Sequence, residues 1–344
     1  MGVLNSWTVL LPEPIEEKAL ALLAGRKMRI LQAEDTKPES VGPLMEQADA
    51  VVLRTGLTMS AQLIERGRRL ATISRTGAGY DNVDIEAATR HGVVVTSSIG
   101  ANTYTVSEHT LALILSLAKQ LSILDRETRK GNFRVRYDYL PRDLRGMTIG
   151  MVGFGRIGQE VAKICATALG MRILAYDEYL SNELRRRMSS WVSFCSLEEL
   201  LAASDVVSIH VPLTPQTKGL INRQAICAMK KGALLVNTSR GGIIDEEALA
   251  EALNSGHLGG AGIDVFAKEP PTEANPLLKA ANAVLTPHAA ALTQECVVHM
   301  AVLAAQRVLD IYDGFIPENV ANPEVLGQER WKGLKPKAYS QNSH

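Results

Sequence analysis

The feature that most constrains the fold of this chain is the stretch of sequence between residues 147 and 177. It begins with an apolar run at 147–152 that is typical of a buried parallel strand. A glycine-rich turn follows at 153–158, and apolar residues then recur at helical spacing. A second apolar run at 171–176 ends at Asp177. This order of strand, glycine turn, helix, strand and acidic residue is the one that a dinucleotide-binding βαβ unit requires.

Three glycines of the turn have separate physical tasks in such a unit. Gly153 permits the tight turn out of the strand, and Gly155 lets the backbone approach a pyrophosphate because it has no side chain. Gly158 allows the following helix to pack close to the strand. The free N–H groups and the positive dipole end of that helix then favour a phosphate.

Asp177 indicates which dinucleotide binds. A carboxylate at this distance from the glycines can accept hydrogen bonds from both ribose hydroxyls, and it would repel a 2′-phosphate. No arginine follows at once, since the next residues are Glu178, Tyr179 and Leu180. We therefore expect NAD, and not NADP, as the cofactor.

Charge and composition argue against several other classes of protein. The chain has 37 Lys+Arg and 37 Asp+Glu, and this zero net charge argues against a nucleic-acid or anionic-membrane partner. The four cysteines show no C-x-x-C spacing, which is typical of free thiols in a reducing cytoplasm. Because the sequence also lacks a signal peptide and an apolar span of about twenty residues, we expect a cytoplasmic protein with no membrane partner. We also expect no bound metal.

The length allows two domains, and the N-terminal part alternates strands with helices. The predicted strands are 7–10, 28–31, 50–53, 71–74 and 93–96, and the predicted helices include 15–24, 60–66 and 85–91. Such alternation predicts a parallel sheet with right-handed crossovers. Because no G-x-G-x-x-G sequence precedes residue 150, we do not expect this half to bind the nucleotide.

The second half continues the alternation. Residues 103–124 are predicted to form one long apolar helix between domains or subunits, and 131–141 a loop. Further strands are predicted at 206–211, 233–237, 262–266 and 283–285, and further helices at 197–203, 224–229, 245–254 and 293–313. Residues 331–344 are predicted to be a disordered tail.

Three polar residues lie at or beyond the ends of predicted strands in the second half, namely Arg240, Glu269 and His288. Ligands bind outside the carboxyl ends of the strands in a doubly wound sheet, so these side chains are expected to converge near the glycine turn. An arginine can clamp a carboxylate, and a histidine held by a glutamate can exchange a proton near neutral pH. This set suits hydride transfer to a 2-keto acid. Taken singly, each residue is more often an ordinary surface or loop residue.

Several long blocks in a fixed order carry a resemblance to a known family. They are RTGAGYDN at 75–82, residues 100–110, GFGRIG at 153–158, HVPLT at 210–214, VNTSRGG at 236–242, residues 264–270 and TPH at 286–288. Over roughly residues 45–320 the sequence thereby resembles the D-isomer-specific 2-hydroxyacid dehydrogenases. The family includes phosphoglycerate dehydrogenases and hydroxypyruvate or glyoxylate reductases.

The resemblance implies roles for individual residues. Arg240 would bind the substrate carboxylate and keto oxygen, His288 would be the acid and base, and Glu269 would be its partner. The residues that would bind the cofactor are Gly153, Gly155, Arg156, Ile157, Gly158, Asp177, Thr238 and Asp264, the last two at the nicotinamide carboxamide. His210, at a strand end, is expected to pack near the adenine. The residues that would bind the substrate are Thr76, Gly77, Ala78 and Gly79, through backbone N–H groups, and Arg54, through a second anionic group.

The resemblance also implies an architecture. The fold would be α/β, with two doubly wound parallel-sheet domains. A flavodoxin-like substrate domain would take residues 1–102 plus 290–330, and a Rossmann-type NAD-binding domain would take 103–289. The long helix that starts near Thr103 would build a homodimer.

The implied activity is NAD-dependent transfer of a hydride between nicotinamide and C2 of a D-2-hydroxy acid or 2-keto acid. 3-Phosphoglycerate, hydroxypyruvate and glyoxylate all remain candidate substrates, because the sequence departs from the family pattern at Ile99 and at 289–293, next to the expected substrate pocket. The alternative is an NAD-sensing corepressor-type binding protein with little turnover. Such proteins share the fold and keep Arg240, Glu269 and His288, so the three residues do not exclude it.

Overall fold

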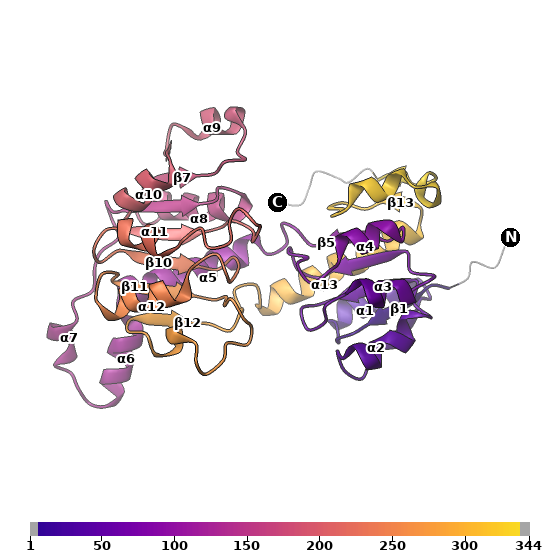
Figure 1. Cartoon of the computed structure of the whole chain (residues 1–344), viewed down its shortest axis with the longest axis horizontal. Coiled ribbons are helices and arrows are strands. Elements are labelled where there is room, and N and C mark those ends of the chain that lie inside the picture. Colours follow the sequence, from indigo (N-terminus) through magenta and orange to yellow (C-terminus); the bar gives the residue numbers. More distant parts are fainter. Residues whose placement is uncertain (1–5, 338–344) are drawn as a thin grey trace. The chain divides into compact units, whose positions relative to one another are not determined.

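A computed structural model describes residues 6–337, which divide into two compact units. Unit 1 takes in the described residues up to Asn102 and from Thr293 onward, and unit 2 is Thr103–Leu292. Each unit is built on a sheet of parallel strands with helices packed against it (Figure 1). The predicted fold class, α/β with two parallel sheets, is confirmed.

Unit 1 contains a five-stranded sheet in the order β2-β1-β3-β4-β5. Its strands are β1 (Thr8–Leu11), β2 (Arg29–Gln32), β3 (Ala50–Leu53), β4 (Thr72–Arg75) and β5 (Val94–Ser97). Its helices are α1 (Glu17–Gly25), α2 (Pro38–Met45), α3 (Ala61–Arg66), α4 (Ile85–Arg90) and α13 (Gln294–Tyr312). The strand order reverses between β1 and β3, as in flavodoxin-like sheets. The sequence patterns missed α2, which contains Pro43.

Helix α13 packs on the same sheet, although it lies about two hundred residues further along the chain. Small side chains such as Ala301, Ala304 and Ala305 are fully buried there and let the helix approach the strands closely. The Thr293 hydroxyl accepts a hydrogen bond from the amide of Cys296 and so caps the helix N-terminus.

The residues after α13 cover the edge strand β5, as the yellow part of Figure 1 shows. They form β13 (Phe315–Ile316), two short 3₁₀ helices (Pro323–Gly327 and Glu329–Trp331) and β14 (Lys335–Pro336). The Asn322 side chain accepts from the amide of Val95 at 2.9 Å and donates to the carbonyl of Val93 at 2.9 Å. These bonds satisfy backbone groups at the sheet edge.

The predicted disordered tail is wrong for residues 331–337. The Trp331 side chain is only 7% exposed, and its indole N–H donates to the Gly92 carbonyl at 2.9 Å. One buried aromatic residue therefore anchors a segment whose remaining composition is polar. Residues 338–344 lie outside the described part of the chain.

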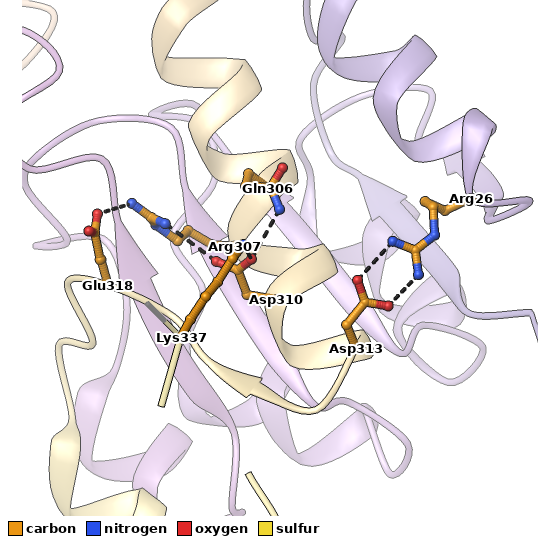
Figure 2. A network of polar contacts seen from close by, with 7 residues as sticks. All are labelled: Arg26, Gln306, Arg307, Asp310, Asp313, Glu318 and Lys337. Carbon is orange, nitrogen blue, oxygen red and sulfur yellow. Dashed lines mark hydrogen bonds and ion pairs between the residues drawn. The ribbon is translucent and has the colours of Figure 1, made fainter. Parts of the chain in front are cut away.

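A polar network centred on two buried residues of α13, Arg307 and Asp310, holds the same segment (Figure 2). The Asp310 carboxylate, 1% exposed, accepts from Gln306 at 3.0 Å and from Arg307 at 3.3 Å, and it also pairs with Lys337. Arg307 donates to Glu318 at 2.6 Å through its second terminal nitrogen. Buried charges need such partners because transfer out of water is costly.

Unit 2 contains a seven-stranded parallel sheet in the order β12-β11-β10-β9-β6-β7-β8. Its strands are β6 (Thr148–Val152), β7 (Arg172–Tyr176), β8 (Val192–Phe194), β9 (Val206–Ile209), β10 (Leu234–Asn237), β11 (Gly260–Ile263) and β12 (Ala283–Leu285). The longer helices are α5 (Thr103–Ala118), α6 (Leu121–Arg129), α8 (Arg156–Thr167) and α12 (Glu246–Asn254). The shorter ones are α7 (Val135–Asp138), α9 (Asn182–Met188), α10 (Leu197–Ala203) and α11 (Arg223–Ala228). The order reverses between β6 and β9, which is the Rossmann-type switch point.

Residues 103–124 form two helices and not the predicted single one. Gln120 has a left-handed backbone (φ 56°), so α5 ends and α6 begins in a new direction. In Figure 1, α6 and α7 extend from the body of unit 2. Helix α7 lies inside the predicted loop 131–141. Among the described residues no helix combines the length and apolarity needed to span a membrane.

We predict that Asp310→Asn destabilises unit 1 by about 3 kcal/mol, because it leaves Arg307 and Lys337 around a neutral partner. Asp313→Asn is the control: Asp313 pairs with Arg26 at the surface (Figure 2), so its loss should cost at most about 1 kcal/mol. Urea unfolding is followed by tryptophan fluorescence in a Trp191→Phe background, where the remaining two tryptophans both belong to unit 1. Equal losses in the two variants would contradict the prediction.

Candidate active site

The three predicted catalytic residues follow three neighbouring strands of unit 2. Arg240 follows β10, Glu269 follows β11 and His288 follows β12. β10 pairs with β11 and β11 pairs with β12, all in parallel, so the loops that carry the three residues share one edge of the sheet.

Glu269 and His288 form a hydrogen-bonded pair. The distance between Glu269 Oε2 and His288 Nδ1 is 2.7 Å, and Glu269 Oε1 accepts from the amide of Phe266 at 3.1 Å. Burial alone would raise the pKa of Glu269, but the bonds to His288 and Phe266 and the nearby charge of Arg240 outweigh it, and the pKa is lowered. The carboxylate is therefore ionised at neutral pH and can only accept. His288 Nδ1 must donate to it, which leaves Nε2 to exchange a proton with a substrate.

The backbone of His288 is in the left-handed conformation, with φ 52°. Few residues other than glycine adopt it, and such strain persists only where surrounding contacts hold it. The amide of His288 donates to the carbonyl of Asp264 at 2.7 Å. This bond ties the histidine to the end of the neighbouring strand.

Two residues shape the loop that carries Arg240. The buried Asn237 side chain accepts from the amide and the hydroxyl of Ser239 and donates to the Arg240 carbonyl at 2.9 Å. A Cβ on Gly241 would lie 1.8 Å from the Phe266 carbonyl oxygen, so only glycine lets this loop approach the one that carries Glu269. The sequence patterns did not predict a role for Asn237, although an Asn at a strand end is typical of a turn.

Asp264 lies at the centre of this edge with a fully buried side chain. Its carboxylate accepts from the Thr286 hydroxyl at 2.5 Å and from the amides of Ala289 and Ala290 at 2.8 and 3.0 Å. Thr238, predicted at the nicotinamide carboxamide, is also buried, and its hydroxyl bonds that of Thr110 on α5 at 2.8 Å. The sequence did not predict Thr286 as the partner of Asp264 or Thr110 as the partner of Thr238, because only tertiary contacts reveal these pairs.

The three glycines of the turn differ in their backbone conformation and in the space around them. Gly153 has φ 94°, and a Cβ on Gly158 would lie 2.4 Å from the Gly153 carbonyl oxygen. A Cβ on Gly155 would meet nothing within 4 Å. Gly155 is also the N-cap of α8, and no side chain of the described residues caps that helix. The first amides of α8, from Arg156 on, are therefore available to an anion.

Asp177 directly follows β7, beside this turn. Its carboxylate accepts from the amide of Phe154 at 2.8 Å and from that of Tyr179 at 2.9 Å, so it faces the glycine turn. His210 packs beneath the same turn and bonds Ser208 at 2.8 Å. Burial lowers the pKa of His210 to about 4. The imidazole is therefore neutral at pH 7 and adds no positive charge there.

The predicted substrate-binding residues belong to unit 1. Arg54 follows β3, and the loop from Thr76 to Gly79 follows the adjacent β4, so both lie at the carboxyl edge of that sheet. Arg54 Nη1 donates to Glu16 at 3.0 Å and to the Pro14 carbonyl at 3.2 Å. Its charge is therefore already compensated by a carboxylate.

The sheet of unit 2 is doubly wound, and the glycine turn at its switch point leads into a helix that no side chain of the described residues caps. An imidazole–carboxylate pair lies at the edge of the sheet. These features define a dinucleotide-binding domain of the dehydrogenase type. Residues 111–290 match the family model "D-isomer specific 2-hydroxyacid dehydrogenase, NAD binding domain". The chain belongs to this family, and NAD is its cofactor.

Three known proteins illustrate the similarity. A D-3-phosphoglycerate dehydrogenase of Archaeoglobus fulgidus is 38% identical over 95% of this chain and 62% of its own length. A glyoxylate reductase of Korarchaeum cryptofilum is 38% identical over 85% of this chain and 89% of its own length. The crystal structure of D-lactate dehydrogenase from Aquifex aeolicus, complexed with NAD and lactic acid, is 28% identical and superposes with a TM-score of 0.80, covering 93% of this chain and 97% of that one. Against the phosphoglycerate dehydrogenases that it matches, this chain spans only 52% to 62% of their length.

Proposed function

We propose that this protein is an NAD-dependent oxidoreductase that interconverts a D-2-hydroxy acid and its 2-keto acid. The Glu269–His288 pair carries the proposal, because it leaves His288 Nε2 as a proton donor and acceptor on the sheet edge that holds Arg240. The relatives and the structure named above are dehydrogenases and a reductase, which favours this activity over the corepressor-type alternative.

The residues of unit 2 fit NAD. The amides at the start of α8 would hold the pyrophosphate, near Arg156 and Ile157, because Gly155 leaves open space in front of them. The Asp177 carboxylate would accept hydrogen bonds from the hydroxyls of the adenosine ribose. Thr238 and Asp264 would face the nicotinamide, and His210 would pack at the adenine side. When bound, the nicotinamide ring gives or takes the hydride.

Arg240 and His288 would act on the acid itself. The Arg240 guanidinium would clamp the carboxylate and polarise the keto oxygen. His288 Nε2 would donate a proton to that oxygen as C2 is reduced, and in the reverse direction it would take the proton from the hydroxyl. Glu269 would stabilise the charged imidazole and keep the ring in one orientation.

Two parts of unit 1 would bind the anionic groups of an acid. The backbone N–H groups of the loop from Thr76 to Gly79 would bind the carboxylate. Arg54 would meet a second anionic group only by exchanging its contact with Glu16. Glyoxylate and hydroxypyruvate require no such exchange, whereas phosphohydroxypyruvate does.

The first test measures NADH oxidation with glyoxylate, hydroxypyruvate and phosphohydroxypyruvate. We expect turnover by the unaltered protein and a loss of about 10²–10⁴-fold in kcat for His288→Gln, because the acid and base is gone. NADH binding, followed by fluorescence, should stay within a few-fold of the unaltered protein. His91→Gln on unit 1 is the control and should keep full activity. Unchanged kcat in a folded His288→Gln protein would refute the proposal.

Two alanine variants separate cofactor binding from folding. Gly155→Ala should fold normally and bind NADH at least roughly tenfold more weakly, because the added methyl group occupies the space of the pyrophosphate. Gly158→Ala should destabilise unit 2 by about 1–3 kcal/mol, because its methyl group collides with the Gly153 carbonyl. Calorimetric titration and thermal unfolding measure the two effects. Normal NADH binding by Gly155→Ala would place the pyrophosphate elsewhere.

The protein would act as a homodimer, joined through the α6–α7 region of unit 2. No residue of α6 is buried, and the Phe133, Tyr137 and Leu140 side chains nearby are 68%, 68% and 73% exposed. Apolar groups gathered in this way are typical of a contact with a second copy. Sedimentation at micromolar concentration should show a dimer that Phe133→Ser with Leu140→Ser converts to a monomer, while Leu278→Ser does not. A dimer that survives the double substitution would contradict this interface.

A further inference from the structure

His109, Thr286 and Asp264 of unit 2 form a hydrogen-bonded chain of side chains. The proposed function uses only Asp264 among them, as a residue that would face the nicotinamide. His109, on α5, has Nε2 3.1 Å from the Thr286 hydroxyl and 3.7 Å from Asp264 Oδ1. Thr286 follows β12, and its hydroxyl donates to Asp264 Oδ1 at 2.5 Å. The chain therefore runs from a helix on the face of the sheet to the buried carboxylate at its edge.

The direction of these bonds follows from the number of protons. The Thr286 hydroxyl has one proton, which it gives to the carboxylate, so its oxygen must accept from His109. His109 Nε2 therefore carries a proton. An imidazole that donates through Nε2 and a hydroxyl that donates to Oδ1 hold the carboxylate in one orientation.

That orientation matters because the carboxylate supports the segment after His288. Asp264 Oδ1 also accepts the amide of Ala289 at 2.8 Å, and Oδ2 accepts that of Ala290 at 3.0 Å. The Asp264 carbonyl accepts the amide of His288 itself at 2.7 Å. Residues 288–290 are thus held by three bonds to one residue, and they include the left-handed backbone of His288.

We propose that His109 and Thr286 are positioning residues that act through Asp264 to hold His288 in its reactive place. They need not touch the substrate, and neither of them exchanges the reacting proton. The inference deepens the proposed function and rests on it for the role of His288, but the contacts that carry it belong to the folded chain alone. A displacement of His288 of the order of 1 Å would lower kcat by up to about 100-fold.

Two matched pairs of variants test this proposal. Thr286→Val keeps the shape of the side chain and removes the hydroxyl, whereas Thr286→Ser keeps the hydroxyl. His109→Leu removes the donor, whereas His109→Gln places an N–H near the position of Nε2. We expect kcat to fall about 10–100-fold in the Val and Leu variants and to stay within about threefold in the Ser and Gln variants. The Kd for NADH should change little in all four.

Hydrogen exchange supplies a readout that does not depend on turnover. In the full chain without NAD, the amides of Ala289 and Ala290 should exchange about tenfold faster in Thr286→Val than in the unaltered protein, and at an unchanged rate in Thr286→Ser. Mass spectrometry of peptides that cover residues 285–293 measures it. The His109 pair answers the same question if Thr286→Val does not fold.

The outcomes separate this inference from the proposed function. The inference is supported if amide exchange is faster and kcat is lower in the Val and Leu variants, and if both effects are absent in the Ser and Gln variants. Unchanged exchange, or equal losses in the conservative variants, overturns it, as does a weakened NADH affinity with unchanged kcat. Absence of turnover in the unaltered protein would overturn the proposed function, and the exchange rates would still decide whether His109 and Thr286 hold residues 288–290.

Discussion

The edge of unit 2 that we propose as the active site depends on one buried carboxylate, that of Asp264. Asp264 directly follows β11. Its amide donates to the Asn237 carbonyl at the end of β10, and its carbonyl accepts the amide of His288 beyond β12. Its side chain adds three hydrogen bonds to the residues that follow β12. A buried carboxylate without donors would be strongly unfavourable, so this one is stable only while the three loops keep their places. The loops therefore stay together in part because the buried carboxylate needs the donors that they supply.

Close approach of backbone segments is the second constraint. Gly241 lies against the Phe266 carbonyl, and Gly158 lies against that of Gly153, at distances where no Cβ fits. The first contact brings the loop that carries Arg240 to the loop that carries Glu269. The second brings the N-terminus of α8 to the end of β6, where its uncapped amides face outward. In both cases the absence of a side chain positions groups that we propose to bind or to react.

Charge compensation differs between the two units. In unit 2, Glu269 remains ionised because His288, Phe266 and Arg240 favour its charged form. In unit 1, Arg54 is paired with Glu16, and Arg307 is enclosed by Asp310 and Glu318. The first arrangement leaves Nε2 of His288 without a bond to Glu269, so that it can exchange a proton in the proposed reaction. In the second arrangement the charged groups pair with one another and stabilise the fold. The pairing of Arg54 also explains why the residue type alone does not decide between a phosphorylated and an unphosphorylated acid.

The sequence by itself determined the sheet class, and it predicted which polar residues follow the strands at one edge of the sheet. Continuous apolar runs, helical spacing and the glycine turn are local patterns, and β3 and β12 lie where these patterns predict them. Arg240, Glu269 and His288 could be predicted to converge because parallel strands share one carboxyl edge. Local patterns did not predict the break at Gln120, the helix α2 that contains Pro43, or the anchoring of the C-terminal segment by Trp331. These features, together with the bonds from His109 and Thr286 to Asp264, depend on contacts between residues far apart in the chain. Only the tertiary structure decided them, because a single sequence carries no direct record of which distant polar groups meet.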